Sequence, residues 1–278
     1  MSLALARERA ATEGLPLAIV AAESLHVILL DALFAHPGGP AMAFQGGTCL
    51  HLVHGGYRYS EDIDLAGADL DGDAAARIIE RARPDIERLA VQVLGQGEPA
   101  WKAPRTRGRV TTCWFHFTPR ETSQRIRVKI ELARFPTYHA VVLPVRSSLD
   151  LLERRPLVTA LPPGELLAQK VTAALGRRYL KGRDLFDLWF LDAVLGTASD
   201  LEPDPDLLRR KLEDYDVAPS RHEVRERLDA VAAADLEPEM SRFLPRRQRD
   251  QLGRESYRGI RERARDVLER AARAVGLA

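Results

Sequence analysis

Cysteine and net charge are both scarce in this sequence. Of the 278 residues only two are cysteines, Cys49 and Cys113, and they lie far apart with no Cys-x-x-Cys spacing. Their scarcity excludes a disulfide scaffold and a cysteine-based zinc site, and it suits a reducing cytoplasm. The formal net charge is +1 at pH 7, so the molecule as a whole is not a general electrostatic attractor of nucleic acid.

The sequence also has no long uninterrupted apolar run near its start. Glu23, His26 and Asp31 break the apolar stretch at residues 15–34, and no basic segment precedes it. This pattern predicts a packed helix rather than a signal peptide or a membrane span. We therefore expect a soluble cytoplasmic protein with no membrane partner.

Lysine is rare as well, because only five of the 41 basic residues are lysines. Each lysine is therefore worth inspecting as a candidate functional cation. Arginine gathers at the end of the chain, where residues 241–278 contain eleven arginines against five acidic residues. A solvated helix face is the favoured interpretation of this segment, and a nucleic-acid footprint is the alternative.

Helical and strand periodicities alternate over the first part of the chain. Helical patterns cover residues 2–35, 48–54 and 73–90, and strand patterns cover residues 59–66, 91–95, 109–118 and 126–132. Thr48 is the expected N-cap of the second helix. The segment 95–108, rich in glycine, proline and arginine, is expected to be a loop.

The second part of the chain shows helical patterns only. No convincing strand is found from Leu161 onward, and the composition changes around residues 145–165, where three prolines occur. The sequence therefore predicts an α+β protein, with a mixed-sheet domain at residues 1–155 followed by an all-helical domain at residues 156–278.

Two aspartates form the first candidate site. In the strand at 59–66, Ser60, Asp62 and Asp64 point to the face opposite Ile63 and Leu65. Two carboxylates held side by side repel each other unless a cation lies between them, and such oxygen ligands suit Mg²⁺. Two solvated acids on an exposed strand are the alternative.

Glu131 lies on the polar face of the cleanest strand, 126–132, and could complete a three-carboxylate site. Three carboxylates would suit two-metal catalysis. Pairing with Arg127 or Lys129 on the same face is an equally good interpretation of Glu131 from spacing alone.

Gly46-Gly47-Thr48 precedes the aspartates and predicts a turn for a phosphate group. Glycine allows close backbone approach, a helix start presents free N–H groups to an anion, and the Thr48 hydroxyl adds a donor. A phosphate turn followed by a metal-binding pair is suited to a nucleoside triphosphate. The alternative is an ordinary turn leading to a strand edge.

Lys170 and the segment 181–191 raise the question of buried charge. Lys170 is flanked at helical spacing by leucines and alanines, so it leans toward a packed side, where a bound phosphate or a snorkelling conformation would accommodate its charge. Asp187 lies in an apolar helix and needs a partner, for which Arg183 is one option. Asp184 and Asp187 could act in chemistry or clamp Lys170, and the clamp is favoured.

A His-x-x-His pair, His51 and His54, follows Thr48 and Cys49 in the same predicted helix. No third metal ligand is obvious nearby, so ordinary packing is favoured over a metal site.

Three segments together resemble a known family: 44–50 (FQGGTCL), 58–65 (RYSEDIDL) and 181–188 (KGRDLFDL). They look like the AbiEii/AbiGii nucleotidyltransferase toxins of the polymerase-β-like nucleotidyltransferase superfamily, with a resemblance that runs over residues 40–192. The resemblance implies a nucleotidyltransferase-like mixed-sheet domain, a helical second domain and Mg²⁺-dependent nucleotide transfer. It also implies a cognate antitoxin and, in some members, tRNA 3′ ends as acceptors.

By position, the resemblance assigns roles to individual residues. Those expected to bind nucleotide are Gly46, Gly47, Thr48, Ser60 and Lys170; those expected to bind metal are Asp62, Asp64 and, by a looser match, Glu131. The same three acids, with Lys170, Asp184 and Asp187, are the expected catalytic residues. Two departures are Gln45, where a lysine is common, and Thr48 in place of a serine.

The leading hypothesis is transfer of NMP from an NTP to an acceptor hydroxyl at an RNA 3′ end, with two Mg²⁺ ions. Nucleotidyl transfer to a small molecule such as an aminoglycoside is the second hypothesis. A non-catalytic nucleotide-binding protein is the third, although both aspartates are present.

Overall fold

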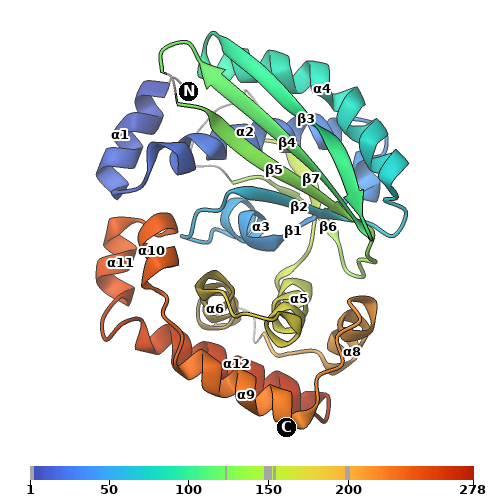
Figure 1. Cartoon of the computed structure of the whole chain (residues 1–278), viewed down its shortest axis with the longest axis vertical. Coiled ribbons are helices and arrows are strands. Elements are labelled where there is room, and N and C mark those ends of the chain that lie inside the picture. Colours follow the sequence, from blue (N-terminus) through green and yellow to red (C-terminus); the bar gives the residue numbers. More distant parts are fainter. Residues whose placement is uncertain (1–2, 123, 147–151, 153–154, 198–200) are drawn as a thin grey trace. The chain divides into compact units, whose positions relative to one another are not determined.

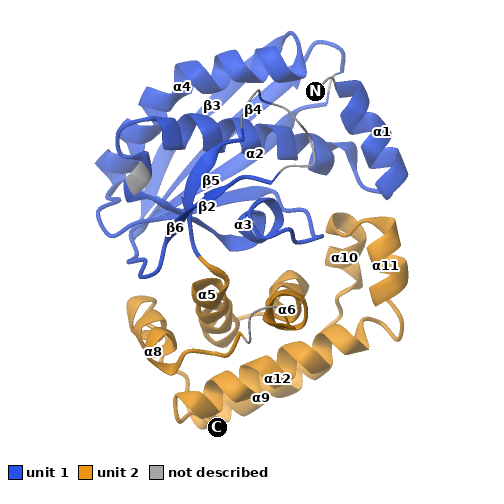
Figure 2. Cartoon of the chain, turned by 180° about the vertical axis from the view of Figure 1, so that it is seen from behind, with its two compact units in different colours: residues 1–161 blue, residues 162–278 orange. Residues whose placement is uncertain are grey.

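The computed structural model describes residues 3–122, 124–146, 152, 155–197 and 201–278 (Figure 1). The chain divides into two compact units, residues 1–161 and 162–278 (Figure 2). The segment in which the sequence places a boundary, 145–165, lies partly outside the described residues, as does residue 2. The division falls after Leu161 because the preceding strand pairs in the sheet of the first unit.

A mixed seven-stranded sheet is the centre of the first unit, in the order β3-β4-β5-β2-β1-β7-β6. β2 runs parallel to β5, β1 runs parallel to β7, and the other neighbours are antiparallel. The strands are β1 (Ala43–Gln45), β2 (Asp62–Ala66), β3 (Gly97–Arg107), β4 (Val110–Pro119), β5 (Ile126–Ala133), β6 (Val141–Pro144) and β7 (Leu157–Ala160).

Helices cover one face of this sheet over β3, β4 and β5. α2 (Leu17–Ala35) packs on β5 and β7, and α4 (Gly72–Leu94) packs on β3 and β4. Isoleucine, leucine and phenylalanine side chains at alternate strand positions fill this layer, as the strand periodicity predicts. The remaining helices of this unit are α1 (Leu3–Glu13), η1 (Gly39–Ala41) and α3 (Gly46–Leu52).

α2 is long and apolar enough to cross a membrane by length and composition alone. In the structure 78% of its most apolar window is buried against the rest of the protein. The helix also carries the buried polar residues Glu23, Ser24 and His26. α2 is therefore a core helix of the first unit.

Several sequence predictions about elements were wrong. Residues 91–94 finish α4 instead of forming a strand, and the predicted loop 95–108 contains the long strand β3. β3 is an edge strand, where prolines such as Pro99 and Pro104 are tolerated because no second neighbour needs their missing N–H. The predicted strand 126–132 was confirmed as β5.

The second unit contains helices and no strand among its described residues. They are α5 (Pro163–Gly176), α6 (Gly182–Trp189), η2 (Phe190–Gly196), α8 (Pro205–Asp214), α9 (Arg221–Ala232), α10 (Glu237–Phe243), α11 (Arg246–Leu252) and α12 (Arg258–Ala274). A fully buried ion pair joins α8 to α5, with Lys211 Nζ 2.7 Å from Glu165 Oε1. The predicted α+β class is confirmed by the mixed sheet and the helices.

Candidate active site

Two glycines make the turn between β1 and α3. Gly46 has φ +78°, and a Cβ at this position would overlap the Asp64 carboxylate. A Cβ on Gly47 would likewise overlap the guanidinium of Arg58. Gly46 therefore needs glycine, because its positive φ and the nearby Asp64 side chain both oppose a Cβ; at Gly47 the overlapping atom is the flexible end of Arg58, which can shift.

Thr48 is not the N-cap that its position predicted. α3 begins at Gly46, and Gln45 is the N-cap, so Thr48 lies inside the helix. Its side chain is completely buried, and Oγ1 donates a hydrogen bond to the backbone carbonyl of Asp62. Thr48 therefore ties α3 to the start of β2, the strand that carries the two aspartates.

The register of β2 and β5 brings the predicted acids together. These strands are parallel, with Asp62 opposite Lys129 and Asp64 opposite Glu131. Residues opposite each other on neighbouring strands point to the same face. Three predicted carboxylates are therefore gathered on one face of the sheet, beside the glycine turn.

Lys129 lies between two of these carboxylates. Its ammonium Nζ is 3.0 Å from Asp62 Oδ2 and 3.2 Å from Glu131 Oε1. Burial opposes the charge on Lys129, but the two carboxylates outweigh it and raise the pKa of the ammonium group. Of the two interpretations of Glu131, the structure thus shows the ion pair with Lys129.

The same carboxylates fit a hard divalent cation. Oxygens of Asp62 and Glu131 both reach one cationic nitrogen, and Mg²⁺ needs only one or two protein carboxylates because water and phosphate complete its shell. Within the described ranges, no group of three or more His, Cys, Asp or Glu side chains is arranged to hold a metal ion. The predicted three-carboxylate, two-metal site therefore stays a prediction; the structure shows that oxygens of Asp62 and Glu131 contact one cationic group, the Lys129 ammonium.

Arg58 and Ser60 lie beside the glycine turn. Arg58 is 3% exposed and donates from Nη1 to the carbonyl of Tyr59 at 2.9 Å. Ser60 Oγ lies 3.4 Å from the position of a Cβ on Gly47. Arg58 stands in the segment that carries the resemblance, but nothing in the sequence pattern assigns it a role. Its burial beside the turn is visible only in the structure.

The remaining predicted residues belong to the second unit. Lys170 Nζ is 2.6 Å from Asp187 Oδ2 and 3.5 Å from Asp184 Oδ1, and Arg177 pairs with the other oxygen of Asp184. Lys170, Asp184 and Asp187 are all buried. The lysine thus joins α5 to α6, and it is an ion-pair partner of Asp187, for which Arg183 had been one option.

Neighbouring cations favour the ionised form of the Asp184 carboxyl group. Burial on its own raises the pKa of the Asp184 carboxyl, but the charges of Lys170 and Arg177 outweigh it and hold that pKa below its usual range. A buried carboxylate with two cationic partners is a clamp between elements. The clamp interpretation of Asp184 and Asp187 is therefore the one that the contacts favour.

Each histidine of the His-x-x-His pair has its own protein partners. His51 Nδ1 is 2.6 Å from the carbonyl of Gly56 and Nε2 is 3.3 Å from Glu23, whereas His54 Nε2 is 2.9 Å from the carbonyl of Leu161. The two rings engage different groups, as ordinary packing requires.

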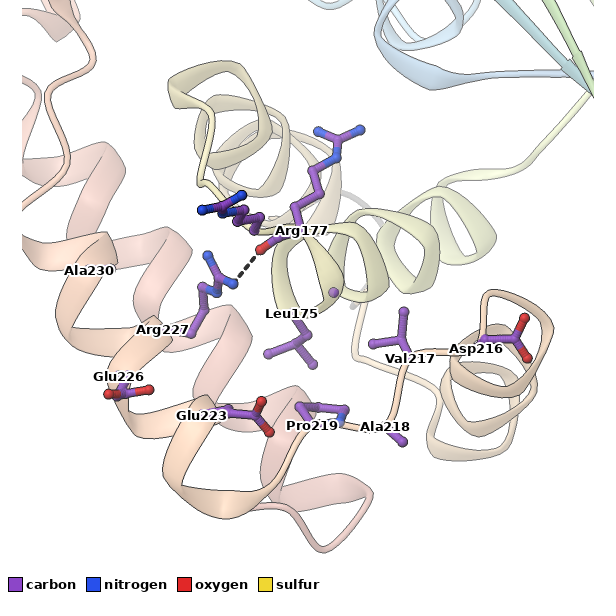
Figure 3. A pocket seen from close by; sticks show the side chains of 12 residues that line it. Leu175, Arg177, Asp216, Val217, Ala218, Pro219, Glu223, Glu226, Arg227 and Ala230 are labelled. Carbon is purple, nitrogen blue, oxygen red and sulfur yellow. Dashed lines mark hydrogen bonds between the residues drawn. The ribbon is translucent and has the colours of Figure 1, made fainter. Parts of the chain in front are cut away.

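The second unit also contains a cavity of about 520 Å³ (Figure 3). On the basic side of the cavity, Arg227 donates a hydrogen bond to the backbone carbonyl of Arg177. The Arg177 side chain extends away from Leu175 and Val217. Its lining comprises Leu175, Gly176, Arg177, Arg178, Asp216, Val217, Ala218, Pro219, Glu223, Glu226, Arg227 and Ala230. No predicted site residue lines this cavity, although Arg177, the second cationic partner of Asp184, does.

Solved structures share this fold. The protein JHP933 from Helicobacter pylori is 15% identical, with a TM-score of 0.51, and the likeness covers 94% of each chain. A candidate nucleotidyltransferase from H. pylori is 14% identical, with the same TM-score, and covers 93% of this chain and 95% of that chain. At these identities the likeness concerns the fold. No curated protein matches the chain significantly.

The sequence itself matches a described family over residues 28–270, "Nucleotidyl transferase AbiEii toxin, Type IV TA system". The match spans most of the chain and includes the glycine turn, the β2 and β5 acids and the Lys170 clamp. The chain therefore belongs to the AbiEii nucleotidyl transferase toxin family of type IV toxin–antitoxin systems.

Proposed function

We propose that this protein transfers NMP from an NTP to the 3′ hydroxyl of an RNA, with tRNA as the acceptor, in a reaction that depends on Mg²⁺. The observation that carries the proposal is that the carboxylates of Asp62 and Glu131 both contact the Lys129 ammonium, beside the Gly46 turn. Carboxylates that converge on one cation next to a close-approach backbone turn are suited to a metal-bound triphosphate.

In this mechanism the chain supplies position and charge. Asp62, Asp64 and Glu131 would hold the metal, which supplies Lewis-acid stabilisation of the charge on the triphosphate. Gly46 and Gly47 allow the backbone to approach the nucleotide, and Thr48 holds α3 on β2 through its bond to Asp62. Most of the rate enhancement would come from such positioning and electrostatics.

The transfer itself forms one bond and breaks one. The acceptor 3′ oxygen attacks the α-phosphorus, the bond from that phosphorus to the pyrophosphate oxygen breaks, and pyrophosphate leaves with the electron pair. The proton of the attacking hydroxyl passes to the Glu131 carboxylate, which is 35% exposed and therefore open to the acceptor.

In the second unit, the contacts of Asp184 and Asp187 with Lys170 assign to the two aspartates the positioning of Lys170. The neutralisation of triphosphate charge by Lys170 is proposed from the family alone. The buried cysteines Cys49 and Cys113, neither of which is in a disulfide, agree with a cytoplasmic site of action, where NTP and RNA are available.

A labelling assay tests the acceptor. The full chain is incubated with Mg²⁺, each α-labelled NTP in turn, and either total tRNA or an aminoglycoside. We expect label in the tRNA and none in the aminoglycoside. Label in the aminoglycoside alone would replace the RNA proposal with the small-molecule one, and label in neither would remove the catalytic proposal.

A growth assay tests the toxin role. Induced expression of the wild-type chain is expected to arrest growth, whereas Asp62→Ala is expected to be harmless. An antitoxin encoded beside the gene is expected to restore growth. If wild type and Asp62→Ala are equally harmless, this part of the proposal is wrong.

A further inference from the structure

One face of the β3–β5 strands carries polar and aromatic side chains. Phe115 and Phe117 of β4 are buried on the face that α2 and α4 cover. Trp114 and His116 alternate with them and so belong to the opposite face. In Figures 1 and 2 the two helices lie on one side of these strands only. This opposite face of β3–β5 is called the open face below.

Trp114 is at the centre of the open face. Its register partners are Lys102 on β3 and Lys129 on β5. The Arg127 guanidinium carbon lies 5.9 Å from the centre of the indole ring, and the His116 ring stacks on it at 6.2 Å with an interplanar angle of 21°. The indole is half-buried. A partly exposed indole flanked by cations is suited to stacking on a nucleobase.

His116 is a buried polar group that needs a partner. It is 7% exposed, and neither ring nitrogen has a hydrogen-bond partner among the described residues. Burial, followed by the charges of Arg125, Lys102 and Arg127, lowers the pKa of the imidazole. The ring is therefore neutral at pH 7, with one donor and one acceptor nitrogen. Buried groups of this kind call for an explanation, and a bound ligand is one.

The charge of the open face complements a phosphate backbone. Lys102, Arg125 and Arg127 are exposed around Trp114, and Arg105, opposite Thr112, is exposed on the same face. The exposed acid Glu98 lies toward the other end of β3, opposite Thr118. Basic side chains around an aromatic ring are the arrangement by which proteins bind single-stranded nucleic acid.

The open face is continuous with the candidate active site. Lys129, the register partner of Trp114, contacts both Asp62 and Glu131. A strand bound across Trp114 would therefore reach Lys129, the residue that contacts both carboxylates. Inside a duplex the bases are already paired and stacked, so a single strand offers the indole more bases than a duplex does.

We propose that the open face, with Trp114 as its stacking platform, binds the single-stranded 3′ end of the acceptor RNA. A base stacks on the indole, His116 hydrogen-bonds a base edge or a ribose hydroxyl, and Lys102, Arg105, Arg125 and Arg127 contact phosphates. The inference rests on the proposed RNA acceptor and names the surface that holds it.

Binding measurements without NTP or Mg²⁺ test this surface separately from catalysis. A short fluorescein-labelled single-stranded RNA is titrated with wild type, Trp114→Ala, Trp114→Phe and the double variant Lys102→Met/Arg127→Met, with thermal melts to verify folding. Arg81→Met/Arg88→Met on α4, which packs on the other face, is the matched control.

Loss of the indole is expected to weaken binding by between about 5-fold and 150-fold, since stacking is worth ~1–3 kcal/mol per base. Phenylalanine is expected to restore most of it. The Lys102/Arg127 double variant is expected to flatten the dependence of log Kd on log salt by about 1.4, at ~0.7 per phosphate contact. The control variant is expected to match wild type.

Three results would overturn the inference: unchanged binding by Trp114→Ala, an unchanged salt slope in the Lys102/Arg127 variant, or tighter binding of a blunt duplex than of the single strand. If Trp114→Ala does not fold, the salt slope decides alone. Wild type that binds no RNA but labels an aminoglycoside would remove the RNA acceptor itself, which distinguishes that failure from a misplaced surface.

Discussion

The ammonium nitrogen of Lys129 lies 3.0 Å from the carboxylate Oδ2 of Asp62, and the same nitrogen reaches Glu131. Lys129 is thus a built-in counter-cation for acids that would otherwise repel each other. A divalent cation that binds Asp62 and Glu131 has to displace this ammonium, so Lys129 competes with the metal.

Substitution of Lys129 by methionine is expected to strengthen Mn²⁺ binding in the absence of nucleotide. Removal of a like charge next to the site favours the metal, and with solvent screening we expect a decrease in Kd on the order of ten-fold. Calorimetric titration measures it. Arg127→Met, two residues away on the same strand face, is the control and should change Kd little. Weaker binding by Lys129→Met would contradict competition.

Gly46→Ala is expected to disrupt the carboxylate site, with Gly55→Ala as its matched control. Both glycines have positive φ, +78° and +76°, so alanine costs about 1–2 kcal/mol of stability at either position. Only at Gly46 would the new Cβ overlap Asp64, because nothing lies within 4 Å of one at Gly55. Mn²⁺ affinity should fall in Gly46→Ala alone; equal affinities in the two variants would show that the close approach is irrelevant.

Lys170→Met is expected to destabilise the second unit. The substitution leaves Asp184 and Asp187 buried without their shared cation, and breaking a buried pair costs about 3–5 kcal/mol. Urea unfolding measures the loss. Arg177→Met removes a cation that is 41% exposed and should cost less. A cost for Lys170→Met below about 0.5 kcal/mol, as at ordinary surface positions, would contradict the clamp.

His26 is expected to make stability depend on pH. Burial lowers its pKa from 6.5 to about 4, and neutral Nε2 donates to the carbonyl of Glu61 at 3.2 Å. Below pH 6.5 the unfolded chain binds the proton first, so the free energy of unfolding falls as the pH drops toward 4. By pH 5 the loss is about 2 kcal/mol relative to pH 7.

Unfolding of wild type and His26→Gln at pH 7 and pH 5 checks this sign. The loss between the two values should be smaller in His26→Gln, while His222→Gln, at an exposed position, should behave as wild type. Equal losses in wild type and His26→Gln would show that His26 is not the group responsible.

Local patterns predicted the elements whose faces differ in polarity. β5 was predicted nearly to the residue because Val128 and Ile130 are buried between charged neighbours. β3 was missed because an edge strand tolerates prolines and exposes most of its side chains, which removes the alternation. The short strands β6 and β7 were missed because four residues carry too little pattern.

The candidate site was predictable where it depends on one strand or one turn. The period of β2 placed Asp62 and Asp64 on one face, and the double glycine marked the close approach. The partner of Glu131 was not predictable, because the register between β2 and β5 joins segments far apart in the sequence. Trp114 and Arg58 were missed for the same reason, since their significance lies in their neighbours.

The central claim is that the acids on β2 and β5 support metal-dependent nucleotide transfer. Its most direct test is single-turnover labelling of tRNA by wild type and Asp62→Asn over a range of Mg²⁺ concentrations, with Asp71→Asn, the N-cap of α4, as the control. We predict Mg²⁺-dependent labelling by wild type and Asp71→Asn, and a loss of at least a hundred-fold in Asp62→Asn, about 2.7 kcal/mol of transition-state stabilisation. Equal labelling by wild type and Asp62→Asn would contradict the account.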